Sequence, residues 1–315
     1  MKNPRMKDPA TSGRASGLIA ITVTSLLWGT TGTAATFAPE VSPLAIGAAA
    51  LGIGGLLQAL IAAPALRARR SALRPQVRIV MAGALSVAVY PLAFYSSMHL
   101  AGVAIGSVVS LASAPIASGL LERILDHRPL SRWWIISASL GAQGSIMLCA
   151  SNSDAPGGSA WTTAAGVVLG LVAGLTYAIY SWAVHRLMRS GIGRAASMGS
   201  IFGFGGLLLM PVLLLTGAPI LHSVGNFAVA VYMALVPMFL GYLLFGYGLT
   251  KVSASTATTV TLTEPAAATL LAVVVVGERL GPLGWGGLAI IGSVLVILAV
   301  APTNEPRDPR RPENW

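Results

Sequence analysis

Residues 252–276 read VSASTATTVTLTEPAAATLLAVVVV, an apolar stretch that is long enough to cross a bilayer as a helix. Near its middle stands a carboxylate, Glu264, followed directly by Pro265. No basic residue nearby in the sequence could neutralise it. A charged side chain at the bilayer centre costs about 2.5–3.5 kcal/mol or more, so Glu264 is a functional candidate by default.

The composition of the whole chain indicates the same membrane setting. Hydrophobic residues make up 55% of the 315 residues and charged residues 10%, which is far from the balance of a soluble domain. The sequence predicts an all-α integral membrane protein, with no room left for a soluble domain. We expect ten transmembrane helices, at about 16–35, 44–65, 77–98, 101–122, 132–150, 161–185, 195–216, 225–248, 252–276 and 283–301.

The net charge of +10 follows the loops, which argues against a nucleic-acid partner. With ten crossings and the N-terminus inside, 19 of the 20 basic residues fall on the inner side, and only Arg279 lies outside. We therefore expect a bacterial inner-membrane protein with cytoplasmic tails at 1–15 and 302–315. The basic runs at 67–74 and 307–311 could also touch anionic membrane lipid.

An offset of 150 residues aligns the two halves of the chain, 16–150 and 161–301. It matches Pro115 with Pro265, Ala117 with Ala267, and Leu130 with Leu280. Because each half holds five helices, an odd number, the second half must lie inverted relative to the first. Inverted repeats are a recurring plan of secondary transporters, with the substrate site in a cavity near mid-membrane where the halves meet. We expect Pro115 and Pro265 to make a matched pair of helix kinks at that cavity.

Four short passages resemble the EamA-type branch of the drug/metabolite transporter superfamily, and the resemblance covers about 16–301. The passages are Leu27-Trp28-Gly29, Ala173-Gly174-Leu175-Thr176-Tyr177-Ala178, Glu264-Pro265 and Gly277-Glu278-Arg279-Leu280. The resemblance implies ten helices in two inverted five-helix repeats around a central cavity, and transport, often export, of small metabolites. The chain departs from the family at Arg128-Pro129-Leu130, where the first half usually repeats its Gly-Glu signature.

Aromatic residues inside the predicted spans could line a substrate path. Trp28, Tyr90, Tyr180 and Tyr242 lie deep in their spans, which fits a cavity better than an interfacial belt. Core packing is the competing interpretation for each of them. We expect these four residues, with Glu264, to contribute to substrate binding or coupling.

Charged residues at the helix ends have simpler interpretations. Glu122 and Arg123 close the fourth helix near the inner surface, where they could form an interfacial ion pair or a gate latch. The histidines are widely separated at or beyond helix ends, a spacing that gathers no metal ligands. We therefore expect neither a metal nor a cofactor.

Motifs favour transport over catalysis. No Walker-type Gly-x-x-x-x-Gly-Lys, His-Glu-x-x-His or Gly-x-Ser-x-Gly occurs. A single mid-membrane carboxylate suits binding or proton coupling better than catalysis. The sequence predicts an exporter of amino acids, related metabolites or amphipathic drugs, with an uptake permease or facilitator of the same fold as the alternative. A membrane-embedded enzyme is disfavoured.

The same carboxylate suggests how exchange could work. A protonated acid is much less costly in hydrocarbon than its anion. A proton could therefore neutralise Glu264 when a cationic substrate group leaves it. The coupling ion would then be the proton.

Overall fold

Apolar, helix-favouring residues form one long helix after another in the computed structural model, which describes residues 9–151, 160–271, 273–274 and 281–301. The expected tails and the passage 277–280 lie outside the described residues, except for the start of the first helix. Backbone groups in a bilayer must be satisfied within the chain, and helices do this locally. The first half contains α1 (Pro9–Thr36), α2 (Pro43–Gly47), a π-helical segment η1 (Ala48–Ile53), α3 (Gly54–Ala68), α4 (Arg70–Leu73), η2 (Arg74–Gln76), α5 (Val77–Ala101), α6 (Val103–Leu125) and α7 (Arg132–Ser151).

The second half continues in the same way, and the part of the chain that the structure describes contains no strand. It contains α8 (Ala160–Arg189), α9 (Arg194–Thr216), η3 (Ala218–Leu221), α10 (Val224–Met233), a π-helical segment η4 (Ala234–Leu240), α11 (Gly241–Leu249), α12 (Ala254–Val260), α13 (Thr263–Leu271) and α14 (Pro282–Val300).

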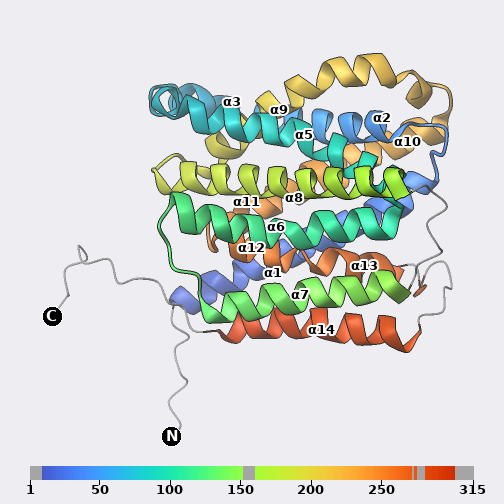
Figure 1. Ribbon diagram of the computed structural model, residues 1–315. Helices are drawn as coiled ribbons and strands as arrows, with labels where there is room; N and C mark the ends of the chain where they lie inside the picture. Colours follow the sequence, from blue (N-terminus) through green and yellow to red (C-terminus); the bar gives the residue numbers. More distant parts are fainter. Residues whose placement is uncertain (1–8, 152–159, 272, 275–280, 302–315) are drawn as a thin grey trace, which may run out of the picture.

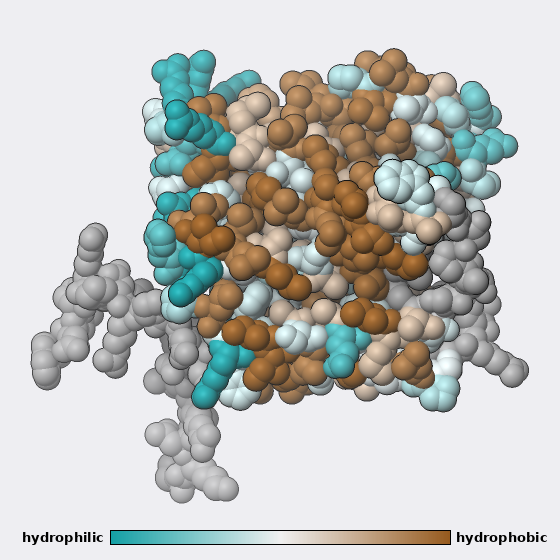
Figure 2. Space-filling model, viewed as in Figure 1, coloured by the Kyte–Doolittle hydropathy of each residue, from teal (hydrophilic) through white to brown (hydrophobic). Residues whose placement is uncertain are grey.

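Eight helices among the described residues are long and apolar enough to cross a membrane. They are Gly13–Thr36, Pro43–Ala68, Arg70–Ala101, Ile105–Leu125, Ala160–Arg189, Arg194–Thr216, Val224–Leu249 and Pro282–Val300. The helices run side by side, and a broad hydrophobic band covers the visible face while hydrophilic side chains gather mainly at its two ends (Figures 1 and 2). The chain is an integral membrane protein.

Two predicted spans fall outside those eight. One is α7, which packs along α14 at the lower edge of Figure 1. The other is the stretch 252–276, which we predicted as one helix. The structure divides it into α12 and α13, with a turn at Thr261 and Leu262.

Pro265 explains why that prediction was wrong. Proline has no backbone N–H, and its ring clashes with the carbonyl of the residue four positions earlier, which is Thr261. The Thr261 carbonyl instead accepts the N–H of Glu264 at 2.9 Å, one residue short of the helical register. The helix therefore ends before the proline and restarts at Thr263.

The predicted loop at 66–76 is mostly helical. Helix α3 continues to Ala68, and α4 and η2 lead directly into α5. By contrast, the predicted near-absence of a loop between the third and fourth spans is confirmed. Gly102 alone separates α5 from α6, with φ of +87°, a backbone conformation that favours glycine.

Small residues let the helices approach closely within one chain. A Cβ on Gly174 of α8 would lie 2.6 Å from the Ser110 carbonyl of α6. On Gly203 of α9 it would lie 2.5 Å from Ala59 of α3. These contacts agree with the close helix packing of membrane proteins. The described ends of the chain also meet, because Arg14 of α1 donates to the carbonyl of Ala301 at 2.7 Å.

Candidate functional site

Four aromatic residues from four helices meet in the middle of the bundle. Trp28 of α1 lies 4.8 Å from Tyr242 of α11, and Tyr90 of α5 lies 5.7 Å from Tyr180 of α8, measured between ring centroids. The Tyr180 and Tyr242 hydroxyls are 2.7 Å apart and hydrogen-bonded. All four side chains are buried. The structure thus brings together every aromatic residue that the sequence selected.

The π-helical segment η4 holds Trp28 in place. Its indole N–H donates to the carbonyl of Pro237 at 3.0 Å. A π-helical turn and a proline both release backbone carbonyls from the ordinary helical pattern. One turn further, the Thr24 hydroxyl donates to the carbonyl of Gly241. Side chains of α1 thus bind the backbone carbonyls that the irregular helix would leave without a partner. These bonds hold α1 against η4 and α11.

Glu264 lies beside this aromatic cluster, in the first turn of α13. Its side chain is 8% exposed, and it lines a cavity of about 20 Å³ together with Trp28, Tyr90 and Tyr242. That volume holds about one water molecule. The oxygen Oε2 is buried and has no hydrogen-bond partner in the described part of the chain. A buried carboxylate without a partner is costly, so it is the most reactive group toward a proton or a cation in this region.

Irregular backbone surrounds the small cavity. Its walls include Ala50 and Leu51 of η1, Pro91 of α5 and Met238 of η4. π-Helical turns occur mostly as single bulges and frequently at functional sites. The break between α12 and α13 also contacts the aromatic cluster. At the break the Thr261 hydroxyl lies 2.8 Å from the hydroxyl of Tyr177, whose ring contacts Trp28 and Tyr90.

The two selected prolines occupy different positions. Pro265 directly follows Glu264 and causes the break described above. Pro115 is buried within α6, which runs unbroken from Val103 to Leu125, and it does not line the small cavity. Tyr180 does not line the small cavity either, but its ring contacts the rings of Tyr90 and Tyr242, which do.

The selection of four residues by depth in the sequence passed over three further aromatic residues of the same cluster. Tyr177 lies 5.2 Å from Tyr180, Phe245 lies 5.9 Å from Tyr242, and Tyr95 lines the small cavity. The spacing of three residues between Tyr177 and Tyr180, and between Tyr242 and Phe245, places each pair on one helix face. That spacing is a signal that could have found Tyr177 and Phe245.

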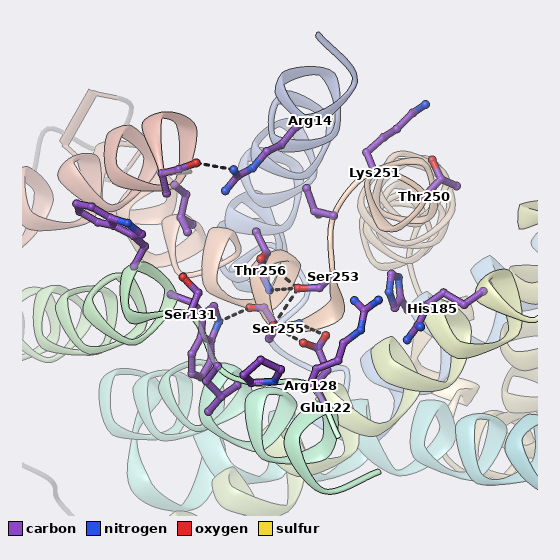
Figure 3. Close-up of a pocket in the computed structure, with 18 residues that line it drawn as sticks. Arg14, Glu122, Arg128, Ser131, His185, Thr250, Lys251, Ser253, Ser255 and Thr256 are labelled. Atoms are coloured by element: carbon purple, nitrogen blue, oxygen red, sulfur yellow. Dashed lines mark hydrogen bonds between the residues drawn. The ribbon is translucent and has the colours of Figure 1, made fainter. Parts of the chain in front are cut away.

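A second, larger cavity of about 400 Å³ opens at the end of the bundle where α6 and α8 finish and α12 begins. It shares no lining residue with the small cavity. On its wall Glu122 of α6 accepts the Ser255 N–H at 3.0 Å and the Ser255 hydroxyl at 2.7 Å (Figure 3). Glu122 thus links α6 to α12, and among the described residues it forms no ion pair with Arg123. Its interpretation as a gate latch stays a prediction.

The link at Ser255 satisfies the beginning of α12. The Ser253 hydroxyl caps this short helix by accepting the N–H of Thr256. The Glu122 carboxylate accepts the N–H of Ser255, which has no partner within the helix. Trp134 of α7 donates its indole N–H to the Ser255 carbonyl at 3.0 Å. One serine thus joins α6, α7 and α12 at this end of the molecule.

Fold and cavities define a helical membrane protein with a small central cavity lined mainly by aromatic and aliphatic residues and by Glu264. Comparison with known proteins gives its family. A model described as the EamA-like transporter family matches residues 15–150 and 164–300. The chain is 33% identical over 289 residues to "Uncharacterized transporter YwfM" of Bacillus subtilis, which covers 90% of this chain and 94% of that one. The chain belongs to the EamA-like transporter family and is a transporter rather than an enzyme.

Two further similarities extend the comparison. The "Probable terminal-alkyne amino-acid exporter" of Streptantibioticus cattleyicolor is 25% identical over 288 residues, covering 86% of this chain and 92% of that one. One solved crystal structure superposes with a TM-score of 0.70 at 21% identity, covering 90% of this chain and 95% of the other. At that identity the superposition establishes the fold.

Proposed function

We propose that this transporter exports amino acids or related small metabolites across the bacterial inner membrane in exchange for protons. The observation that carries the proposal is Glu264, a buried carboxylate with one unpartnered oxygen against a cluster of aromatic side chains. An amine group of a substrate could bind this carboxylate, while the aromatic rings would accept its apolar part and attract its positive charge. The name of the Streptantibioticus relative supports an amino acid as substrate.

Protonation of Glu264 completes the proposed cycle. When a cationic group leaves, a proton neutralises the carboxylate, which hydrocarbon then tolerates. When a substrate arrives from the cytoplasm, its amine displaces the proton. The site is thus never left as a bare anion, and each outward movement of substrate is linked to one proton.

The proposed path between the cytoplasm and Glu264 follows α12. This helix carries hydroxyl side chains along its length, and those of Thr258 and Thr259 donate to backbone carbonyls of their own helix. Such bonds can be exchanged for bonds to a passing polar solute. From Ser255 to the end of α12 at Val260 the rise is roughly 7.5 Å at 1.5 Å per residue, and the turn at Thr261 and Leu262 leads on to Glu264. A short polar path would therefore join the two cavities.

The architecture that accompanies this proposal has ten crossings. Beyond the eight long apolar helices, we propose that α7 and the broken pair α12–α13 also cross the membrane. The two segments matched by the family model, 15–150 and 164–300, coincide with the two halves expected to be inverted repeats. The hydrogen bond between Arg14 and Ala301 joins the start of α1 to the residue that follows α14. The first and last helices thus begin and end on the same side, which agrees with an even number of crossings.

Counterflow in proteoliposomes tests the proposed function. The purified protein is reconstituted, the vesicles are loaded with single members of an amino-acid and metabolite panel, and internal pH is followed with a trapped dye. We expect accumulation of labelled substrate by counterflow and, in a separate run without external substrate, net efflux of the loaded substrate with acidification of the vesicle lumen as protons enter in exchange. If no member of the panel exchanges, export of amino acids is wrong, and net efflux without a change of internal pH would remove proton coupling.

A further inference from the structure

The cavity of about 400 Å³ at the inner end of the bundle has strongly basic walls. Four cationic side chains, Arg14, Arg128, Arg189 and Lys251, line it together with a single carboxylate, Glu122, so its walls carry three more positive than negative charges. The positive-inside rule explains why basic residues lie at this end. It does not explain why they surround a cavity that is large enough for a small metabolite.

Most of these charges already have partners. Arg14 donates to the Ala301 carbonyl, and Arg189 lies 3.8 Å from the Asp126 carboxylate, which also pairs with Arg186. Glu122 is occupied by Ser255. The ammonium of Lys251 lies 5.9 Å from the centroid of the Tyr247 ring. Arg128 differs from all of them, because within the described part of the chain its guanidinium forms no hydrogen bond, ion pair or contact with an aromatic ring.

His185 supplies a second unsatisfied group in the same cavity. Its Nδ1–H donates to the Leu249 carbonyl at 3.0 Å, and the residue lines the cavity. Nε2 is buried and has no partner among the described residues. Arg128 and His185 both lie on the same side of the cavity as Glu122, whereas Lys251 points away from it (Figure 3).

We infer that this cavity binds the carboxylate of the transported solute, and that Arg128 is its main ligand. An arginine presents two parallel N–H groups that match the two oxygens of a carboxylate. The partner-free guanidinium gains these bonds without losing others. Trp133 and Leu298 in the same walls offer apolar surface to the rest of the solute.

The basic cavity would bind a carboxylate and Glu264 would bind an amine, so the two sites suit the two charged groups of one amino-acid-like solute. A solute with both groups would meet the basic cavity first and the acidic central site second, as it moves outward along α12. The inference therefore rests on the proposed direction and deepens the proposed function. It predicts substrates that carry a carboxylate and excludes simple amines.

Equilibrium binding tests the inference without any transport. The full-length protein is placed in phosphatidylcholine nanodiscs, and binding of labelled benzoate is measured by dialysis, with benzamide as the neutral competitor of the same shape. We expect one saturable benzoate site that a tenfold excess of benzamide does not affect. Arg128→Gln should weaken binding at least tenfold, and Arg128→Lys should recover part of it because lysine keeps the charge but not the paired donors.

Arg123→Gln is the matched control, since Arg123 is exposed at the same end of α6 and does not line the cavity. It should leave benzoate affinity within twofold of the wild-type value. Equal losses in both variants, equal competition by benzamide, or no benzoate binding would overturn the inference. A failed counterflow assay beside intact benzoate binding would overturn the transport proposal alone.

Lipid is the competing source of an anionic group. The binding measurement is repeated in nanodiscs that contain phosphatidylglycerol. Unchanged benzoate affinity supports a solute site, because a headgroup phosphate that occupied the cavity would compete. Loss of benzoate binding in these nanodiscs would assign the cavity to lipid and overturn the inference.

Discussion

Glu264 is the residue on which proton coupling depends. Glu264→Gln keeps the shape and the hydrogen-bonding capacity of the side chain but removes ionisation. We expect the variant to insert normally and to lose pH-dependent transport, measured as counterflow rates over a series of internal pH values. Glu40→Gln is the control, because Glu40 is an exposed turn residue. An unchanged rate and pH profile in Glu264→Gln would make Glu264 structural and the coupling mechanism wrong.

The four aromatic residues test whether the cluster binds substrate. Alanine at Trp28, Tyr90, Tyr180 or Tyr242 should weaken transport or change substrate preference. Because removing a buried aromatic ring costs about 3–5 kcal/mol in soluble proteins, Tyr180→Phe and Tyr242→Phe are included, which remove only the shared hydrogen bond.

Trp285→Ala serves as the control for the aromatic series, since Trp285 is 53% exposed on the flank of α14. Its transport rate should match the wild-type rate. Folding is checked by size-exclusion profile and membrane yield. Wild-type transport in all four alanine variants would leave the cluster as packing and remove it from the substrate path.

At the scale of helices, contact between α1 and α13 positions Glu264. A Cβ on Gly29 would lie 2.9 Å from the Ala267 side chain and 3.1 Å from the Glu264 carbonyl. Gly29→Ala should therefore push α13 away from α1, with a cost of about 1–3 kcal/mol if overpacking in soluble cores is a guide. We expect lower thermal stability and reduced transport.

Gly32→Ala provides the comparison within the same helix. A Cβ there would meet nothing within 4 Å, so the helix gains a better helix former at no steric cost. Thermal unfolding in detergent and counterflow together distinguish the two variants. Equal behaviour of Gly29→Ala and Gly32→Ala would show that α13 tolerates displacement near Glu264.

The elements also show what sequence patterns can and cannot predict. Long apolar runs gave the helix positions to within a few residues, because hydrophobic length decides a membrane span. They did not reveal the break before Pro265, since Pro115 of α6 stands in a helix that continues through it. The segment before Pro265 is rich in threonine, whose hydroxyls bond backbone carbonyls and compete with the helical pattern.

The candidate site was predictable in part for a related reason. Trp28 and Glu264 could be selected because they lie deep in predicted membrane spans. For Glu264 the cost of burying a carboxylate gave a further physical reason. The cavity around Arg128 and His185 was not predictable, because it forms where helices distant in sequence end together. Histidines and arginines at or near helix ends look solvated in a sequence, and only the packing of α6, α8 and α12 encloses these two.

The whole molecule is tested by its orientation. The inner side is expected to hold 19 basic residues. The hydrogen bond between Arg14 and Ala301 places the start of α1 beside the end of α14. We predict that both termini are cytoplasmic. Reporter fusions after Asn314 should be active as cytoplasmic reporters, and fusions in the 151–160 loop should be active on the periplasmic side. A periplasmic C-terminus would mean an odd number of crossings, so that α7 or the α12–α13 pair would not span and the inverted repeat would fail.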